Sequence, residues 1–241
     1  MALSAQVAVA VEGLIGAAAA LGMPGAYSPH GGATLLVREH QIRLLDDTVV
    51  GAPMHMTCGV VEMGESEASL LLSLVDTTTD AIAAMVLTRV AHASSVESRP
   101  FPWPRRAHEK AEAMRMVGAA PPLPAMPGQP AESAPGFVCA ARGGVTVGEC
   151  DAFGRMRPDA LAARLSGGLA LLAPRSAALG LEVRDLRLVY ERAPIAGDRL
   201  EMRSSVPAGD EGRPASIHRL VDPETDVAFA SAQTAWRLRE G

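Results

Sequence analysis

Lysine is almost absent from this chain, in which one lysine, Lys110, stands beside 21 arginines. A phosphate-binding P-loop and a Schiff-base site each need a lysine at a defined place, so the sequence has almost no material for either chemistry. No apolar run reaches the roughly 20 residues that cross a bilayer. The net charge is −5 and there is no basic block, which argues against a nucleic-acid partner. We therefore predict neither a membrane span nor nucleic-acid binding.

Cysteines and clustered metal ligands are also scarce. The three cysteines, Cys58, Cys139 and Cys150, form no CxxC pair, and the six histidines show no HExxH spacing. This pattern predicts free thiols, no metal site and no cofactor. The apolar, alanine-rich residues 1–21 resemble a signal peptide, but no basic residue precedes the apolar run and Glu12 interrupts it. We expect a buried helix there, and a cytoplasmic protein.

The chain is long enough, and at 48% apolar residues hydrophobic enough, to build a sizeable core. Its prolines are unevenly placed, because nine of the 18 fall between Pro100 and Pro135. Such a composition suits neither a helix interior nor a sheet interior. We predict a linker over residues 92–136, with one short helix at 106–117, between an N-terminal half (1–91) and a C-terminal half (137–241).

The two halves are related in sequence. Shifted by 146 positions, the first half matches the second without a gap for about fifty residues. Nearer the start the offset becomes 155, and the nine-residue difference is a longer loop at residues 22–32 of the first half. A constant offset over this length indicates an internal duplication. The identical pairs include Arg38/Arg184, Gly51/Gly197, Met56/Met202, Val60/Val206, Asp76/Asp222, Asp80/Asp226, Ala84/Ala230 and Thr88/Thr234.

Each copy predicts one helix followed by about four antiparallel strands. The helices are expected at residues 5–21 and 158–179, where small or apolar residues cover every face and predict burial all round. Period-two alternation then indicates strands, for example at residues 54–60 and 200–206. Polar turns at residues 76–80 and 222–226 lead into the last strand of each copy.

A helix surrounded by a curled sheet, present twice, resembles a double hot-dog fold. Residues 147–158 strengthen the resemblance, since they are similar to the Asp-x-x-Gly-His-Met-Asn stretch before the central helix in the 4-hydroxybenzoyl-CoA thioesterase and acyl-ACP thioesterase group. Asp151, Gly154 and Met156 match that stretch. The resemblance implies an α+β tandem hot dog, each half a long central helix wrapped by a curled antiparallel sheet. The two sheets would join edge to edge, with both helices on one side.

In that group the aspartate acts as nucleophile or general base on an acyl thioester. The resemblance therefore implies a thioester hydrolase acting on acyl-CoA or acyl-ACP, with Asp151 as the catalytic residue and the acyl chain running between the helices. Backbone amides near Gly154 and Met156 would hold the oxyanion, and arginines would add charge-assisted donors. The expected substrate-binding residues are Phe153, Gly154, Arg155, Met156 and Arg157. A homo-oligomer of double hot dogs is compatible with this interpretation.

Two positions depart from the motif, because its histidine is Arg155 here and its asparagine is Arg157. The counterpart of Asp151 in the first copy would precede Met1, so we expect one acid site of this kind in the chain unless its true start lies upstream. The alternative is a catalytically degenerate hot-dog protein that binds an acyl ligand or acts as a structural partner. A carboxylate of Asp151 that opens into a tunnel would favour the enzyme, whereas one sealed by Arg155 would favour the binder.

Other candidates are weaker. Cys150 is a possible nucleophile, although a lone cysteine is more often a small buried residue. Glu12 is a candidate second acid, and His40, aligned with Leu186, is expected to be a core histidine. The extra loop at residues 22–32 could cover a pocket. The methionines Met54, Met56 and Met202 fit core packing or the wall of an acyl tunnel.

Overall fold

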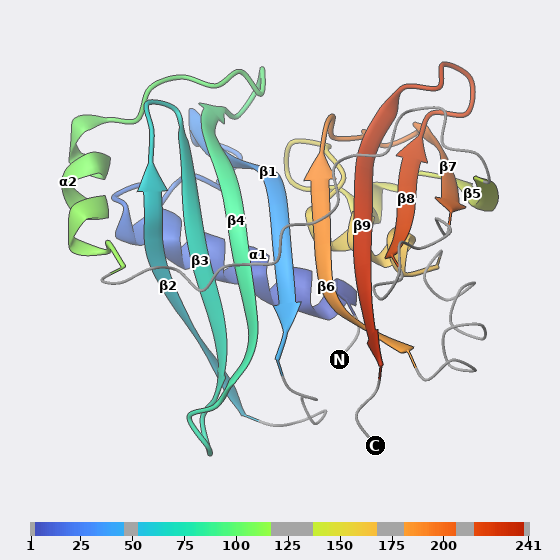
Figure 1. Cartoon of the computed structure of the whole chain (residues 1–241). Coiled ribbons are helices and arrows are strands. Elements are labelled where there is room, and N and C mark those ends of the chain that lie inside the picture. Colours follow the sequence, from blue (N-terminus) through green and yellow to red (C-terminus); the bar gives the residue numbers. More distant parts are fainter. Residues whose placement is uncertain (1–2, 46–52, 117–136, 168–180, 206–214, 239–241) are drawn as a thin grey trace. The chain divides into compact units, whose positions relative to one another are not determined.

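The computed structural model describes residues 3–45, 53–116, 137–167, 181–205 and 215–238 (Figure 1). The chain divides into two compact units, Ala5–Pro122 and Leu123–Gly241. The division falls within the stretch predicted as a linker. Residues 92–116 therefore belong to the first unit, while residues 117–136 of that stretch lie outside the described part. Each unit is described below by itself.

The first unit is a four-stranded antiparallel sheet with a helix against one face. It contains α1 (Leu3–Ala20), β1 (Ala33–Leu44), β2 (Met54–Met63), β3 (Glu67–Asp76) and β4 (Ile82–Ser94). The strand order is β2-β3-β4-β1. In Figure 1, α1 crosses one face of these strands. The predicted helix at 5–21 is thus confirmed to within two residues at either end.

The second unit has the same kind of sheet with one more strand at its edge. It contains β5 (Val138–Gly144), the short 3₁₀ helix η1 (Val147–Glu149), β6 (Leu181–Tyr190), β7 (Arg199–Ser205), β8 (Ala215–Val221) and β9 (Ala228–Leu238). The strand order is β6-β9-β8-β7-β5. Residues 158–167 are helical, and the rest of the helix predicted at 158–179 lies outside the described residues.

The structure repeats the duplication down to its irregularities. β1 to β4 and β6 to β9 pair in the same order, and their bounds agree with the 146-residue offset. Both copies carry β-bulges at matching positions. Related proteins usually retain their bulges, so the match supports the duplication. The matching bulges are Val37/Glu39 with Val183/Asp185, and Leu74/Val75 with Leu220/Val221.

The polar turns before β4 and β9 are also the same. Asp76 Oδ1 accepts the N–H groups of the residues two and three positions on, at 2.7 and 3.2 Å, and Asp222 Oδ1 does so at 2.8 and 3.3 Å. Asp80 and Asp226 close the turns with φ of 56° and 60°. An aspartate tolerates this left-handed conformation better than most residues do. The identity of these residues in the two copies therefore has a backbone cause.

The helix α1 is buried on one side only, which corrects the expectation of burial all round. Val7, Leu14 and Leu21 are fully buried, whereas Ile15 is 49% exposed and Glu12 lies at the surface. Alanine and glycine lose little by contact with water, so an alanine-rich face can remain exposed. The exposed Glu12 lacks the buried setting expected of a second catalytic acid.

Two glycines of α1 make a matched pair for testing this packing. A methyl group added at Gly13 would lie 2.1 Å from Met56 Sδ and 3.2 Å from a methyl carbon of Leu72, whereas one added at Gly16 meets no described atom within 4 Å. We expect Gly13→Ala to lower the free energy of unfolding by about 1–3 kcal/mol through overpacking. Gly16→Ala should raise it by about 0.5–1 kcal/mol. Urea unfolding measures both, and equal effects would contradict this docking of α1 on β2 and β3.

The segment after β4 packs against the first unit and does not extend away from it as a linker. The helix α2 (Arg105–Ala113), close to the predicted 106–117, buries Ala107 and Ala111, and Trp103 before it is also buried. Beyond α2, the N–H of Val60 donates to Met114 O at 2.9 Å, and Met116 N–H donates to Val60 O at 3.0 Å. These bonds fix the segment along the edge of β2, where Figure 1 places α2.

Candidate functional site

The motif residues form a tight turn between η1 and the helix that starts at residue 158. We call residues 150–157 the Asp151 turn. Its two ends meet in an antiparallel bridge between Cys150 and Met156, and Met156 N–H donates to Pro194 O at 2.7 Å. Gly154 has φ +75°, a left-handed conformation that favours glycine. This explains why the motif needs a glycine at position 154.

Asp151 organises this turn from within. Its Oδ1 accepts the N–H groups of Phe153 at 2.8 Å and Arg155 at 3.0 Å. The helix begins only at residue 158, so the carboxylate faces the amides of its own turn. The side chain keeps 34% of its surface exposed, so the carboxylate is not sealed from solvent.

Arg155 lies directly on this carboxylate. Its Nε is 3.3 Å from Asp151 Oδ2, its side chain is only 11% exposed, and its guanidinium sits 4.7 Å from the centre of the Phe153 ring. A carboxylate on one side and an aromatic face on the other hold an arginine in a fixed orientation. The structure thus brings together Asp151, Phe153 and Arg155 of the predicted site.

The backbone amides expected to hold an oxyanion are already used, and that expectation is wrong. Gly154 N–H donates to Asp151 O at 3.0 Å, and Met156 N–H donates to Pro194 O. The closed turn consumes these donors in its own hydrogen bonds. The donor beside the carboxylate is instead the Arg155 guanidinium. Met156 itself is buried, which leaves its side chain to pack under the turn.

Arg157 is held by the protein. It forms a two-pronged contact with Asp159 at 3.1 and 3.3 Å, and its Nη1 donates to Gly148 O at 3.0 Å. The hydrogen bond to Asp159 raises the pKa of the Arg157 guanidinium further. Arg157 therefore ties the turn to η1 and to the first turn of the helix.

Sequence reasoning missed the anchor beneath the Asp151 turn. Glu149 accepts two hydrogen bonds from Arg164, at 2.8 and 3.0 Å, and also accepts the N–H and hydroxyl of Thr146. These donors, the Arg164 guanidinium first, lower the pKa of Glu149 to about 2. The Thr-x-x-Glu spacing at residues 146–149 is a capping-box signature that could have revealed it.

Cys150 does not have the environment of a nucleophile. Its thiol donates to Thr146 O at 3.4 Å, and burial together with the nearby Asp151 and Glu149 raises its pKa. A thiol must ionise to act as a nucleophile, so this setting disfavours it. Over the described residues, no group of three or more His, Cys, Asp or Glu side chains could hold a metal ion.

A buried polar cluster in the second sheet was not anticipated. His218 is fully buried, with Ser204 Oγ 2.9 Å from Nδ1 and Ser216 Oγ 3.0 Å from Nε2, and Ser216 also contacts the Thr234 hydroxyl. Burial lowers the pKa of His218 to about 4, so the ring is neutral at pH 7. Ser204 lies on the same face as Met202, two residues earlier. A methyl group added at Gly167 of the helix would lie 3.8 Å from Met202 Cε, so this face of the sheet is the one next to the helix.

The first sheet carries one comparable pair. His40 is fully buried, as expected of a core histidine, with its Nδ1 2.9 Å from Thr88 Oγ1, and burial lowers its pKa to about 3. Thr88 and Thr234 are equivalent in the two copies. At the positions equivalent to Ser204, Ser216 and His218, however, the first copy has Cys58, Leu70 and Leu72. The cluster is therefore a feature of the second copy.

The extra loop of the first copy does cover a pocket, as the sequence suggested. A pocket of about 500 Å³ lies between this loop, the end of β4 at His92 and the proline-rich residues 101–106. Within the described part of the chain, no helix is both long and apolar enough to cross a membrane.

No protein-family model matches the chain, and no curated protein matches it in sequence. Solved structures do resemble it. A Lactobacillus plantarum protein provisionally assigned as an oleoyl thioesterase matches with TM-score 0.78 at 14% identity, over 100% of this chain and 90% of its own. A 12:0-ACP thioesterase from Umbellularia californica gives 0.74 at 14% identity, over 98% and 87%. An acyl-ACP thioesterase from Bacteroides thetaiotaomicron gives 0.71 at 10% identity, over 98% and 90%.

At these identities the likeness concerns the fold. It extends over practically the whole chain, so it includes both copies and the Asp151 turn. The antiparallel sheet with few helices matches the folds of these structures. The chain has the hot-dog fold of the thioesterases.

Proposed function

We propose that this protein hydrolyses acyl thioesters of acyl carrier protein or coenzyme A, with Asp151 as the general base. The observation that carries the proposal is the Asp151 turn, which offers a partly exposed carboxylate directly beside a fixed guanidinium. Two proteins of the same fold are named as acyl-ACP thioesterases, which supports this substrate class. A nucleophilic role for Asp151 is the other chemistry that the family resemblance allows.

The proposed reaction uses the two side chains in turn. The oxygen of a water molecule bonds to the thioester carbonyl carbon, and Asp151 Oδ2 accepts a proton from that water at the same time. The carbonyl oxygen becomes an oxyanion, which the Arg155 guanidinium stabilises in place of the occupied backbone amides. The C–S bond then breaks, and the thiolate takes the proton from Asp151. The products are a carboxylic acid and the free thiol of the carrier.

The remaining predicted binding residues differ in whether a substrate can reach them. Gly154 is exposed and Phe153 half-buried, so both can contact a substrate that reaches Arg155. Met156 is buried and Arg157 is held by Asp159 and Gly148, so we assign these two to the support of the turn. We also propose that the two copies form a double hot dog, with a helix against the sheet of each copy and repeats at residues 1–91 and 137–241 on either side of the 92–136 stretch.

A second function is favoured by one observation. Asp151 already receives three hydrogen bonds from its own turn, two from amides to Oδ1 and one from Arg155 to Oδ2, so both carboxylate oxygens have partners that compete with a catalytic water. In that case the protein would bind acyl thioesters without hydrolysing them, and Arg155 would be the residue that prevents turnover.

Substitution of Arg155 separates the two functions. If Arg155 stabilises the oxyanion, Arg155→Gln should lower kcat for a medium-chain acyl-CoA by about tenfold to a hundredfold, with a smaller change in KM. If Arg155 blocks Asp151, the wild type should bind the thioester without turnover, and Arg155→His should create activity. A thiol-release assay measures both variants.

The chain offers a matched control for this substitution. Arg192 lies over the Phe229 ring at the same 4.7 Å and belongs to the same unit, but it is not part of the Asp151 turn. Arg192→Gln should leave kcat within about twofold of the wild type. An equal loss in both variants would mean that the effect is one of stability, and it would contradict the role proposed for Arg155.

A further inference from the structure

The pocket in the first unit has a buried floor and an open rim. Met23, Ala26 and His92 are buried and line its base, while Pro24, Phe101 and Arg106 are exposed at its edge. Its volume of about 500 Å³ lies in the range of small-molecule sites, which are concave and mostly apolar with a few polar groups. All the residues that line it belong to the first unit.

The wall contributed by residues 23–32 is not part of the repeated architecture. This loop contains the nine residues by which the first copy exceeds the second between the helix and the first strand. Its bend is well defined, since Ser95 Oγ donates to Gly31 O at 2.5 Å and Gly31 N–H donates to Ser28 O at 2.9 Å. The pocket is therefore distinct from the Asp151 turn, and the duplication alone does not account for it.

The opposite wall is made rigid by stacked rings. The His92 ring lies parallel to Trp103, with centroids 4.9 Å apart, and tilted against Phe101 at 4.1 Å. His92 Nδ1 is 3.0 Å from Pro102 O and 3.2 Å from Phe101 O. Carbonyl oxygens only accept, so Nδ1 carries the proton and the ring is locked against the chain. The resulting wall is apolar and preformed.

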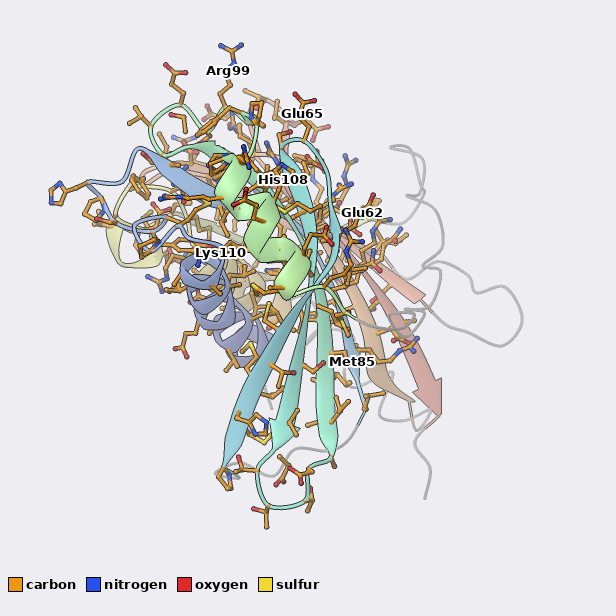
Figure 2. All side chains as sticks on the ribbon, turned by 90° about the vertical axis from the view of Figure 1, so that its left-hand side faces the viewer. Glu62, Glu65, Met85, Arg99, His108 and Lys110 are labelled. Carbon is orange, nitrogen blue, oxygen red and sulfur yellow. The ribbon has the colours of Figure 1, made fainter. Side chains whose placement is uncertain are left out.

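Arg106 lines the pocket, and Lys110 lies one helical turn further along α2. Neither forms an ion pair with a described residue, whereas Arg105 of the same helix pairs with Glu109 at 2.8 Å. A methyl group added at Gly22 would lie 3.3 Å from Lys110 Cδ and 3.7 Å from Arg106 Nε, so both side chains reach the start of the loop. Figure 2 shows Lys110 on the side of α2 towards α1.

The start of α2 adds donors at the same rim. Pro104, the residue before the helix, lines the pocket and supplies no side-chain cap. Ala107 N–H donates to Pro104 O at 2.8 Å, so among the first amides of α2 those of Arg105 and Arg106 are the ones for which the described residues provide no acceptor. The positive end of a helix favours an anion. An apolar, preformed cavity with two cations and a helix start near one edge suits a molecule that has a carboxylate head and a hydrocarbon body.

We propose that this pocket is a binding site for a free fatty acid in its carboxylate form, with the head group at Arg106 and Lys110 and the chain against Met23, Ala26 and Phe101. The site goes beyond the proposed hydrolysis, because it lies in the other copy and contains no residue of the Asp151 turn. If the protein is a thioesterase, the ligand is the chemical class of its own product.

The test uses the emission of Trp103, which is one of only two tryptophans and stacks on the pocket wall. Titration of the full chain with decanoate should change the emission in a saturable way, and the change should persist in Trp236→Phe but vanish in Trp103→Phe. Arg106→Gln should weaken decanoate binding by about tenfold. Arg105→Gln is the matched control, since Arg105 is the adjacent residue but pairs with Glu109, and it should change the affinity less than twofold.

Three further arms decide the identity of the ligand. Decanol, which lacks the charge, should bind more weakly than decanoate and should not respond to Arg106→Gln. Asp151→Asn should bind decanoate like the wild type, so a failure of the proposed hydrolysis would leave this site intact. Displacement of decanoate by coenzyme A, which carries phosphates but no acyl chain, would overturn the fatty-acid assignment. Absence of a saturable signal, or equal losses in the Arg105 and Arg106 variants, would overturn the site.

Discussion

Replacement of Asp151 by asparagine should lower the hydrolysis of a medium-chain acyl-CoA by at least about a hundredfold, because general base catalysis contributes that much or more. Asparagine retains an oxygen that can accept the amides of Phe153 and Arg155, so the turn should keep its shape. It cannot take a proton from water or carry the charge that faces Arg155. A thiol-release assay over several acyl lengths measures the loss, and urea unfolding checks that the fold is retained.

Asp198 provides the matched control for this substitution. It also accepts a backbone amide with its carboxylate, from Ile195 at 3.0 Å, and Ile195 pairs with Arg155 in an isolated bridge. Asp198→Asn should therefore remove a carboxylate charge from the same neighbourhood without removing the proposed base, and turnover should stay within about twofold. Unchanged turnover in a folded Asp151→Asn protein would refute the assignment of Asp151 as general base.

The sequence predicted where this site lies but not how its parts are bonded. The spacing of Asp151, Gly154 and Met156 placed a turn before the second helix. Whether the amides of that turn are free depends on backbone angles, which the residue types do not determine. The pairing of Arg155 with Asp151 depends on a side-chain rotamer fixed by Phe153. Such local geometry follows from tertiary packing, so residue spacing alone could not supply it.

The duplication made most of the fold predictable. A constant offset placed four strands in each copy, and shared residues such as Asp80 and Asp226 marked shared turns. The segment after β4 was harder, because its prolines suggested a tether. Trp103 and Ala107 pack this segment onto the first sheet. Proline content excludes regular structure at a position, but it does not exclude burial of the residues in between.

The polar cluster of the second sheet illustrates a signal that was available but unused. At the 146-residue offset, His218 falls on Leu72 and Ser216 on Leu70, both of which are buried. The equivalence therefore predicted that these polar side chains face a core. A buried polar group needs hydrogen-bond partners, and the nearest candidates on that face are the serines and the threonine found there.

Acidification should destabilise this protein well before its carboxylates titrate. His218 and His40 have pKa values of about 4 and 3 in the folded state, against 6.5 for a free histidine. Below pH 6.5 these two histidines are protonated in the unfolded chain but stay neutral in the folded chain. The free energy of unfolding therefore falls as the pH falls. Each histidine lowers the free energy of unfolding by about 1.4 kcal/mol per pH unit. Each therefore contributes roughly 2–3 kcal/mol between pH 6.5 and 4.5. Urea unfolding across this range measures the slope.

Substitution of His218 should lower that slope by the contribution of one histidine, about 1.4 kcal/mol per pH unit. His218→Gln keeps a side chain that can bond to Ser204 and Ser216 but removes the titrating ring, so one proton per molecule disappears from the linkage. His108→Gln, on the exposed surface of α2, is the control and should leave the slope unchanged. The paired carboxylate of Glu149, with its pKa near 2, loses its contribution only below about pH 4.5, outside this window. A slope in His218→Gln equal to that of the wild type would mean that His218 is protonated in the folded protein, and the buried Ser204–His218–Ser216 chain would then need a different hydrogen-bond assignment.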